Sequence, residues 1–282
     1  MKFLNIELLD YLLDFDDNFW IVTNLSDKIY GYIVYKVDEN GNRYNNITKK
    51  MYTKQKCYEI EITKEIKSIF KPRDFYKNNK QNLTGVWKKY VEILNKIGIN
   101  DIGIFGSYLV GFDIIKDVDF IIYEKENLYK YYDNIELIKN YCNCTDITSE
   151  HIEYQYNKFK DQYNNNCDLK EIISRNWSAI QVKEGVLSTP RFIFSERQNI
   201  PEKKGVDQII KVKVIDGLES TCCPRYCKLE YNNEIYDFYS SVWKYQSFAK
   251  TNDILEMYAN VDIENKIIII DNPKKYYIKY LN

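Results

Sequence analysis

The sequence predicts an α+β protein built from three successive parts. Short runs of β-branched and aromatic residues fill the first part, residues 1–78. A helical pattern followed by two short apolar strands marks the second part, residues 79–205. The third part, residues 206–282, has strands about ten residues apart with turns between them, a spacing that is typical of a small barrel or sandwich. The 282 residues are enough to bury separate cores.

The first part is expected to start with a short helix before "FWIVTN" and to continue as strands. "FWIVTN", "IYGYIVYKV", "MYTKQ" and "KCYEIEI" have period-two character. The polar segment "FKPRDFYKNNKQN" then connects to the second part. We therefore predict a β-rich N-terminal region.

The second part starts with an amphipathic helix over residues 84–99. Thr84 is the expected N-cap and Gly98 lies near the end. "DIGIFGS" is expected to be a strand that leads into a helix start, and "VDFIIY" is a second strand. Helical stretches follow up to about residue 174, and "SAIQVKEGVLSTPRFIFSE" predicts two strands around a turn.

Composition limits the possible partners. The formal net charge of −1 argues against bulk electrostatic attraction to nucleic acid or to anionic membranes. The sequence has no pattern of a signal peptide or of a membrane span, so we expect a soluble cytoplasmic protein without a membrane partner. The chain is rich in Lys, Asn, Ile and Tyr, which is the composition that AT-rich coding sequence produces. Because this bias works against arginine, the few arginines are more informative about function than the lysines. They are Arg43, Arg73, Arg175, Arg191, Arg197 and Arg225.

Cysteine and histidine usage points away from thiol or imidazole chemistry. The seven cysteines show no CxxC pairing, so a disulfide framework or a zinc site is not expected. His151 is the single histidine. Catalysis is therefore expected to rest on carboxylates and a hard cation. The cysteines are Cys57, Cys142, Cys144, Cys167, Cys222, Cys223 and Cys227.

The stretch "GIFGSYLVGFDIIKDVDF", residues 103–120, contains the strongest functional signal. Because side chains alternate along a strand, Asp117 and Asp119 are expected on the same face. Two carboxylates this close repel each other, and burying them costs free energy unless a cation lies between them. A pair of carboxylates suits Mg²⁺ or Mn²⁺. Water and substrate phosphates complete the coordination shell of such an ion.

Gly106 and Ser107, separated from Asp117 by nine residues, supply the second half of the pattern. A glycine allows close backbone approach, and a helix start at this point would favour a phosphate. A phosphate cradle beside a divalent-metal dyad is the equipment for phosphoryl or nucleotidyl transfer.

These residues resemble the signature of the DNA polymerase β-like nucleotidyltransferases. Gly111 matches the second glycine of the minimal members, whereas Lys116 stands where a serine is common and the spacer is about one residue short. The whole chain resembles predicted archaeal nucleotidyltransferases, in which a β-rich region precedes the catalytic core. In that group a small β domain follows the core, and "DGLESTCCPRYCKLE" resembles its start. The resemblance implies a core of mixed sheet with helices, flanked by a β-rich N-terminal region and a small C-terminal β barrel or sandwich.

The resemblance also implies a third carboxylate on a later strand. The expected strand, "PRFIFSE", carries Arg191 and no aspartate. Glu196 ends this strand and Glu184 and Asp168 precede it, and none of the three stands out. Two carboxylates can still bind one metal ion, but a general base for the acceptor hydroxyl would then be missing.

Four further side chains have two interpretations each. Arg191 and Arg197 either clamp triphosphate oxygens or serve as ordinary surface charges. Lys116 either contacts the triphosphate or neutralises the carboxylates. Tyr108 either stacks on a base or packs within the protein.

The resulting hypothesis is a metal-dependent nucleotidyltransferase that moves a nucleoside monophosphate from an NTP to an acceptor hydroxyl and releases pyrophosphate. The acceptor is an RNA end such as that of tRNA, a protein side chain or a small molecule. One alternative is a catalytically degenerate fold that binds nucleotide or RNA, and another is an antitoxin-like partner of a toxin. Asp117 and Asp119 are the predicted catalytic and metal-binding residues, and the predicted nucleotide-binding residues are Gly106, Ser107, Lys116 and Arg191.

Overall fold

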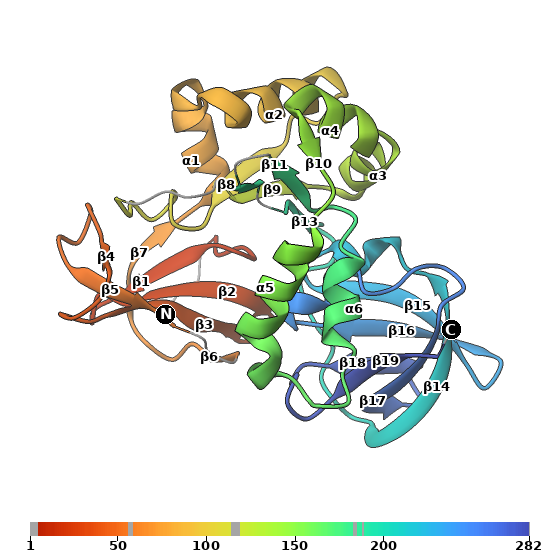
Figure 1. The fold of residues 1–282 in the computed structure, drawn as a ribbon. Helices are drawn as coiled ribbons and strands as arrows, with labels where there is room; N and C mark the ends of the chain where they lie inside the picture. The colour runs from red at the N-terminus through yellow and green to blue at the C-terminus, as the bar shows by residue number, and fades with distance from the viewer. Residues whose placement is uncertain (1–4, 56–58, 114–118, 183–184, 188, 282) are drawn as a thin grey trace. The chain divides into compact units, whose positions relative to one another are not determined.

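The computed structural model describes residues 5–55, 59–113, 119–182, 185–187 and 189–281. The chain forms two compact units (Figure 1). The first unit comprises Met1–Thr145 and Ile180–Gln198, and the second comprises Asp146–Ala179 and Asn199–Asn282. Both units contain strands and helices, so the predicted α+β class is confirmed.

The N-terminal region of the first unit is a seven-stranded sheet in the order β4-β5-β3-β2-β1-β7, with β6 paired to β3. All of its pairings are antiparallel. The expected β-rich character is therefore confirmed. The strands are β1 Tyr11–Asp14, β2 Phe19–Leu25, β3 Ile29–Val37, β4 Arg43–Tyr44, β5 Met51–Lys54, β6 Ile60–Glu61 and β7 Ile66–Phe70.

The short helix expected before "FWIVTN" is wrong for the described residues. Residues 5–10 form turns and irregular backbone, and Tyr11–Asp14 form strand β1. β1 lies between β2 and β7, and all four of its residues are buried. A short run buried on both faces suits a central strand, which the local pattern does not distinguish from a helix.

An aromatic cluster forms the core under this sheet. The Tyr35 ring centroid lies 4.3 Å from that of Phe112, and the Tyr52 centroid lies 5.4 Å from it. Phe19 also contacts Phe112, at 6.0 Å between centroids. Phe112 belongs to the segment that follows β8, so the cluster anchors that segment on the N-terminal sheet.

The second sheet of the first unit has three strands in the order β13-β9-β8. β9 is antiparallel to β8 and parallel to β13. One face packs against helices, because the Phe120 ring lies 4.9 Å from Tyr90 and the Phe192 ring 5.3 Å from Tyr131. The elements are α1 Pro72–Asn79, η1 Lys80–Asn82, α2 Gly85–Lys96, β8 Ile102–Phe105, β9 Asp119–Tyr123, α3 Lys125–Asp133, α4 Ile135–Cys142 and β13 Arg191–Ile193.

Helix α2 is the helix predicted over residues 84–99. Thr84 occupies the N-cap position, although its side chain makes no capping hydrogen bond, and Gly98 follows with a φ of +79°. A smaller three-stranded sheet completes the unit with β10 Cys144–Thr145, β11 Ile180–Val182 and β12 Gly185–Leu187.

The second unit contains a closed five-stranded barrel, which decides between the barrel and the sandwich expected from the sequence. β14 pairs with β17 along its first part and with β15 near its end, and this closes the ring β14-β15-β16-β18-β17. β19 pairs with β17 beside the ring. The strands are β14 Val206–Asp216, β15 Arg225–Tyr231, β16 Glu234–Ser240, β17 Ile254–Asp262, β18 Ile267–Ile270 and β19 Tyr277–Tyr280.

Two helices precede the barrel strands within the second unit. α5 spans Ser149–Phe159 and α6 spans Leu169–Ser174. Leu169, Ile172 and Ile173 of α6 belong to the same buried cluster as the barrel interior. The short 3₁₀ segments of this unit are η2 Lys160–Gln162, η3 Leu218–Thr221 and η4 Trp243–Tyr245.

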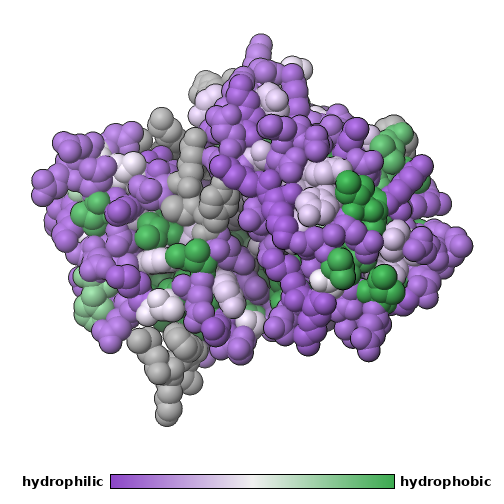
Figure 2. Space-filling view, turned by 90° about the horizontal axis from the view of Figure 1, so that it is seen from below, coloured by the Kyte–Doolittle hydropathy of each residue, from purple (hydrophilic) through white to green (hydrophobic). Residues whose placement is uncertain are grey.

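One face of the molecule is mostly hydrophilic (Figure 2). On the face drawn in Figure 2, hydrophobic side chains lie in separate small groups among hydrophilic ones. The most exposed large apolar side chains are Val206, Phe15 and Ile209. Among the helices that the structure describes, none is long and apolar enough to cross a membrane.

Candidate functional site

The segment between β8 and β9 carries the predicted phosphate-binding residues. Residues 106–111 form successive turns, so the helix start expected after Ser107 is wrong for this segment. Gly106 and Gly111 both have left-handed backbones, with φ of +78° and +79°. The Phe112 N–H donates to the Ser107 carbonyl at 3.1 Å, which folds the segment back on itself. The backbone amides here are therefore those of a glycine-bounded loop, which we call the 106–113 loop.

The N-terminal sheet holds this loop in place. The Asn45 side chain is fully buried and its Nδ2 donates to the Val110 carbonyl at 2.6 Å. The Asn46 N–H donates to the Gly111 carbonyl at 2.8 Å. A Cβ on Gly111 would lie 2.8 Å from the Ile47 side chain. Asn45 was not predicted, because its contact with the loop spans 65 residues of sequence and no local pattern indicates it.

Gly106 lies directly against the Asp119 carboxylate. In the β8–β9 ladder Asp119 is opposite Phe105, the residue before Gly106. A Cβ on Gly106 would lie 2.4 Å from the Asp119 Oδ2, closer than real Cβ atoms come to other atoms. Glycine is therefore required here both by φ and by the close approach of the carboxylate.

Arg191 lies on the same face of the sheet as Asp119. Arg191 is the ladder partner of Ile121, and Ile121 follows Asp119 by two residues along β9. Since side chains alternate along a strand, all three point to one face. The Arg191 residue is only 8% exposed. The strand next to β9 thus contributes a buried guanidinium where the resemblance implies a carboxylate.

The remaining predicted residues are distributed as follows. Asp117 and Lys116 lie outside the described residues. Ser107 is buried, at 7% exposure. The Tyr108 ring packs edge-on against Phe75 of α1, with 5.1 Å between centroids, which favours the packing role. Arg197 lies over the Phe194 ring at 5.9 Å.

The other carboxylates considered as a third acid have the following surroundings. Asp168 belongs to the second unit, where its Oδ2 accepts the Tyr280 N–H at 2.7 Å and fixes strand β19. Glu196 is exposed beyond β13, and Glu184 lies outside the described residues.

Tyr11 reports the charges around Asp119. Burial raises the pKa of the Tyr11 hydroxyl well above its usual value. Nearby Tyr35, Tyr32 and Asp119 raise the pKa further, whereas Arg43 lowers it. The Tyr11 hydroxyl is therefore neutral and lies within electrostatic range of both Asp119 and Arg43.

The donor chemistry fits a hard cation only in part. Asp119 is partly exposed, and a carboxylate oxygen is the ligand type that Mg²⁺ prefers. Within the described residues no group of three or more His, Cys, Asp or Glu side chains could hold a metal ion. The six described cysteines are free thiols.

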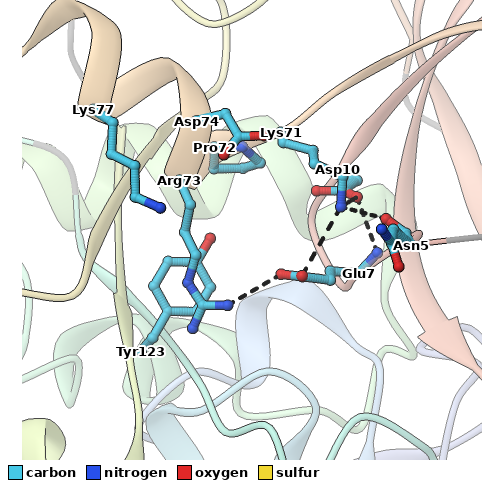
Figure 3. A pocket seen from close by; sticks show the side chains of 9 residues that line it. All are labelled: Asn5, Glu7, Asp10, Lys71, Pro72, Arg73, Asp74, Lys77 and Tyr123. Carbon is cyan, nitrogen blue, oxygen red and sulfur yellow. Dashed lines mark hydrogen bonds and ion pairs between the residues drawn. The ribbon is translucent and has the colours of Figure 1, made fainter.

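A polar pocket lies beyond the other end of β9, next to Tyr123 (Figure 3). Its volume is about 330 Å³. The Arg73 guanidinium stacks over the Tyr123 ring at 3.7 Å and forms ion pairs with Asp101 at 2.9 Å and Glu7 at 3.3 Å. The lining residues are Asn5, Glu7, Asp10, Lys71, Pro72, Arg73, Asp74, Lys77 and Tyr123.

Asp10 is the most perturbed carboxyl group of this pocket. The residue is 1% exposed, and burial raises its pKa to about 7. The Glu7 N–H donates to the Asp10 Oδ2 at 2.9 Å, and the Lys71 Nζ lies 3.8 Å from the same oxygen. The charges of the pocket therefore largely satisfy one another, and Asp10 gains or loses its proton near neutral pH.

Comparison of the chain with protein-family models, with curated proteins and with solved structures finds no match. The functional interpretation therefore depends on the residues and the geometry described above.

Proposed function

We propose that this chain is a metal-dependent nucleotidyltransferase with its active site at the 106–113 loop and the start of β9. The observation that carries the proposal is the contact of Gly106 with Asp119, where a Cβ would lie 2.4 Å from the carboxylate oxygen. The left-handed glycine lets the backbone of the loop approach the partly exposed Asp119, so the loop amides and the carboxylate lie side by side.

The chain's residues would divide the work as follows. Asp117 and Asp119 would hold Mg²⁺ or Mn²⁺, which neutralises charge on the phosphates of the bound NTP. The backbone of Gly106 and Ser107 would lie against the β- and γ-phosphates. Arg191, on the face of Asp119, would contact a phosphate oxygen or orient the carboxylate, and Lys116 would add a second positive charge.

The proposed reaction forms one bond and breaks one. The oxygen of an acceptor hydroxyl attacks the α-phosphorus of the NTP, and the bond from that phosphorus to the bridging oxygen of the leaving pyrophosphate breaks. The hydroxyl proton passes to solvent or to a base that is not yet assigned. An RNA end, a protein side chain and a small molecule are all acceptors of this type.

The test is label transfer from each α-labelled NTP, with Mg²⁺ or Mn²⁺ and a cell extract as the source of acceptors. We expect transfer from the wild-type chain, loss of transfer with a chelator, and loss in the double variant Asp117→Ala with Asp119→Ala. Transfer that persists in the double variant would exclude the proposed site. Pyrophosphate release, measured in parallel, separates transfer from simple NTP hydrolysis to NDP.

The second candidate function is nucleotide binding without turnover. It is favoured by β13, which presents the buried Arg191 beside β9 in place of an acid. In this case calorimetry would show binding of Mg²⁺-NTP, while no NTP and no extract would give pyrophosphate. Replacing Arg191 by Asp would then be informative, since a gain of pyrophosphate release would identify the missing acid as the cause.

A further inference from the structure

The arginines of the described residues differ in what surrounds their guanidinium groups. Three have their guanidinium groups fixed by protein oxygens. Arg73 binds Asp101 and Glu7. Arg175 binds Asp253 at 2.6 Å and Glu171 at 2.7 Å. Arg225 donates to the carbonyls of Trp243 and Thr221.

Arg43 differs from this group. It is the first residue of β4 and is partly exposed. Among the residues that the structure describes, no oxygen accepts a hydrogen bond from the Arg43 side chain and no carboxylate forms an ion pair with it. Its contacts are with aromatic rings: the guanidinium carbon lies 5.6 Å from the Tyr35 centroid and 6.0 Å from the Phe112 centroid.

Aromatic rings hold a guanidinium in position without neutralising it. The ring faces attract the cation and restrict its orientation, while its N–H groups stay available for another partner. Tyr35 and Phe112 are themselves fixed in the core of the N-terminal sheet, with 4.3 Å between their centroids. Arg43 is therefore a positive charge in a prepared position.

Arg43 also lies next to the candidate site. It comes two residues before Asn45 on extended backbone, and the Asn45 side chain contacts the 106–113 loop. The N–H of Asp113 donates to the carbonyl of Tyr44 at 3.2 Å, which brings β4 against the same loop. Both Arg43 and Asp119 act on the Tyr11 hydroxyl, so the two opposite charges share one region.

We propose that Arg43 binds phosphate oxygens of the nucleotide at the site formed by Gly106 and Asp119, so that the N-terminal sheet supplies part of the nucleotide site. This inference rests on the proposed function for the identity of the ligand. A guanidinium matches two phosphate oxygens with parallel N–H···O bonds. The β-rich region thus contributes to binding in addition to holding the loop.

The test measures binding of tripolyphosphate and of Mg²⁺-ATP to the full chain by calorimetry. We expect Arg43→Ala to weaken both affinities about tenfold or more, because charge-assisted hydrogen bonds to phosphate are lost. Arg43→Lys keeps the charge but not the paired geometry, so its loss is expected to be several-fold smaller. Lys36→Ala is the matched control, since Lys36 is an exposed cation on β3 next to Tyr35 and points to the opposite face.

The outcomes separate this inference from the proposed function. Wild-type affinity for both ligands in Arg43→Ala, with an unchanged thermal unfolding curve, would overturn the inference even if nucleotidyl transfer is observed. A loss of affinity in Arg43→Ala, with Lys36→Ala unchanged, supports the inference even if no NTP is ever transferred. If Arg43→Ala does not fold, Arg43→Lys decides, and wild-type affinity in that variant counts against paired phosphate contacts.

Discussion

The two ends of strand β9 carry similar residue types in opposite electrostatic conditions. At the Tyr123 end, the Arg73 guanidinium stacks on the ring at 3.7 Å and also reaches carboxylates on two sides. At the Asp119 end, Arg43 lies over two rings and has no carboxylate partner among the described residues. Each end combines an arginine, an aromatic group and an acid.

The two arginines differ in whether protein carboxylates pair with the guanidinium group. Arg73 forms ion pairs with Asp101 and Glu7, so its interactions stabilise the folded state. Arg43 is held by two rings and has no carboxylate partner among the described residues, which is the arrangement that the proposed phosphate contact requires. The residue type alone carries no information on this point, because it depends on partners that are distant in sequence.

The largest expected effect separates the two ends through their aspartates. Asp119→Asn should lower the rate of nucleotidyl transfer about a thousandfold, because a charge that acts at the reacting phosphates is removed. Asp10→Asn makes the same chemical change at the other end and should leave transfer within about threefold of wild type, since Asp10 is outside the proposed site. Equal losses in the two variants would contradict the assignment of functions to the two ends. Label transfer under single-turnover conditions measures both.

The next effect is the pH dependence that Asp10 gives to stability. The folded-state pKa of Asp10 is about 7, raised from 3.8 by burial, so the folded protein holds this proton more tightly than the unfolded chain. The contribution of Asp10 to the free energy of unfolding is therefore highest below about pH 4, falls as the pH rises from 4 to 7, and stays constant above that.

Asp10→Asn should remove this fall, on the order of 4 kcal/mol, because an amide does not ionise. The free energy of unfolding of both proteins is measured with urea from pH 4 to pH 8. The difference between variant and wild type should shift in favour of the variant as the pH rises. A difference that is constant over this range would show that Asp10 titrates normally.

A smaller effect tests the close approach at Gly106. Gly106→Ala and Gly111→Ala should each destabilise the protein by roughly 1–2 kcal/mol, because both positions have a left-handed backbone. Only Gly106→Ala places a methyl group against the Asp119 carboxylate, whereas the methyl at Gly111 meets the end of the flexible Ile47 side chain. Loss of Mg²⁺-ATP affinity beyond the change in stability is therefore expected in the first variant alone. Calorimetry on both, at a temperature where both are folded, makes the comparison.

The smallest effect concerns the two arginines themselves. Arg73→Ala should lower the free energy of unfolding by about 1 kcal/mol, since its ion pairs are partly exposed to solvent. Arg43→Ala should lower it by less, roughly 0.5 kcal/mol, because only ring contacts are lost. Chemical denaturation of the two variants beside wild type measures the difference. A larger loss of stability in Arg43→Ala than in Arg73→Ala would reverse the division of roles.

Local sequence patterns were enough to predict some helices and strands, but not how the strands pair over long distances. The helix at 84–99 and the short strands after residue 206 follow from periodicity, which depends only on neighbouring residues. Closure of the barrel does not, because it requires β14 to pair with β15 and with β17 in turn. Strand spacing is the same in a barrel and in a sandwich, so both remained possible from sequence.

At the candidate site, the glycine and the aspartate were predictable but their surroundings were not. Gly106 directly follows β8 and Asp119 begins β9, and these two strands pair antiparallel, so the two residues meet through a hairpin-like return of the chain. The loop itself folds as turns because it is bonded to Asn45 and Asn46 of a distant sheet. The position of Arg43 over the Phe112 ring is likewise a contact between residues distant in sequence, which no local pattern reveals.

The division of the chain between the two units has a consequence for synthesis on the ribosome. Strand β13 completes the sheet of the candidate site, but residues 146–179, which belong to the second unit, are translated before it. The apolar side of α6 finds its partners only when the barrel strands after residue 206 have emerged. The first unit can therefore complete its sheets before α5 and α6 have barrel strands to pack against. The order of translation favours early completion of the first unit and late closure of the barrel.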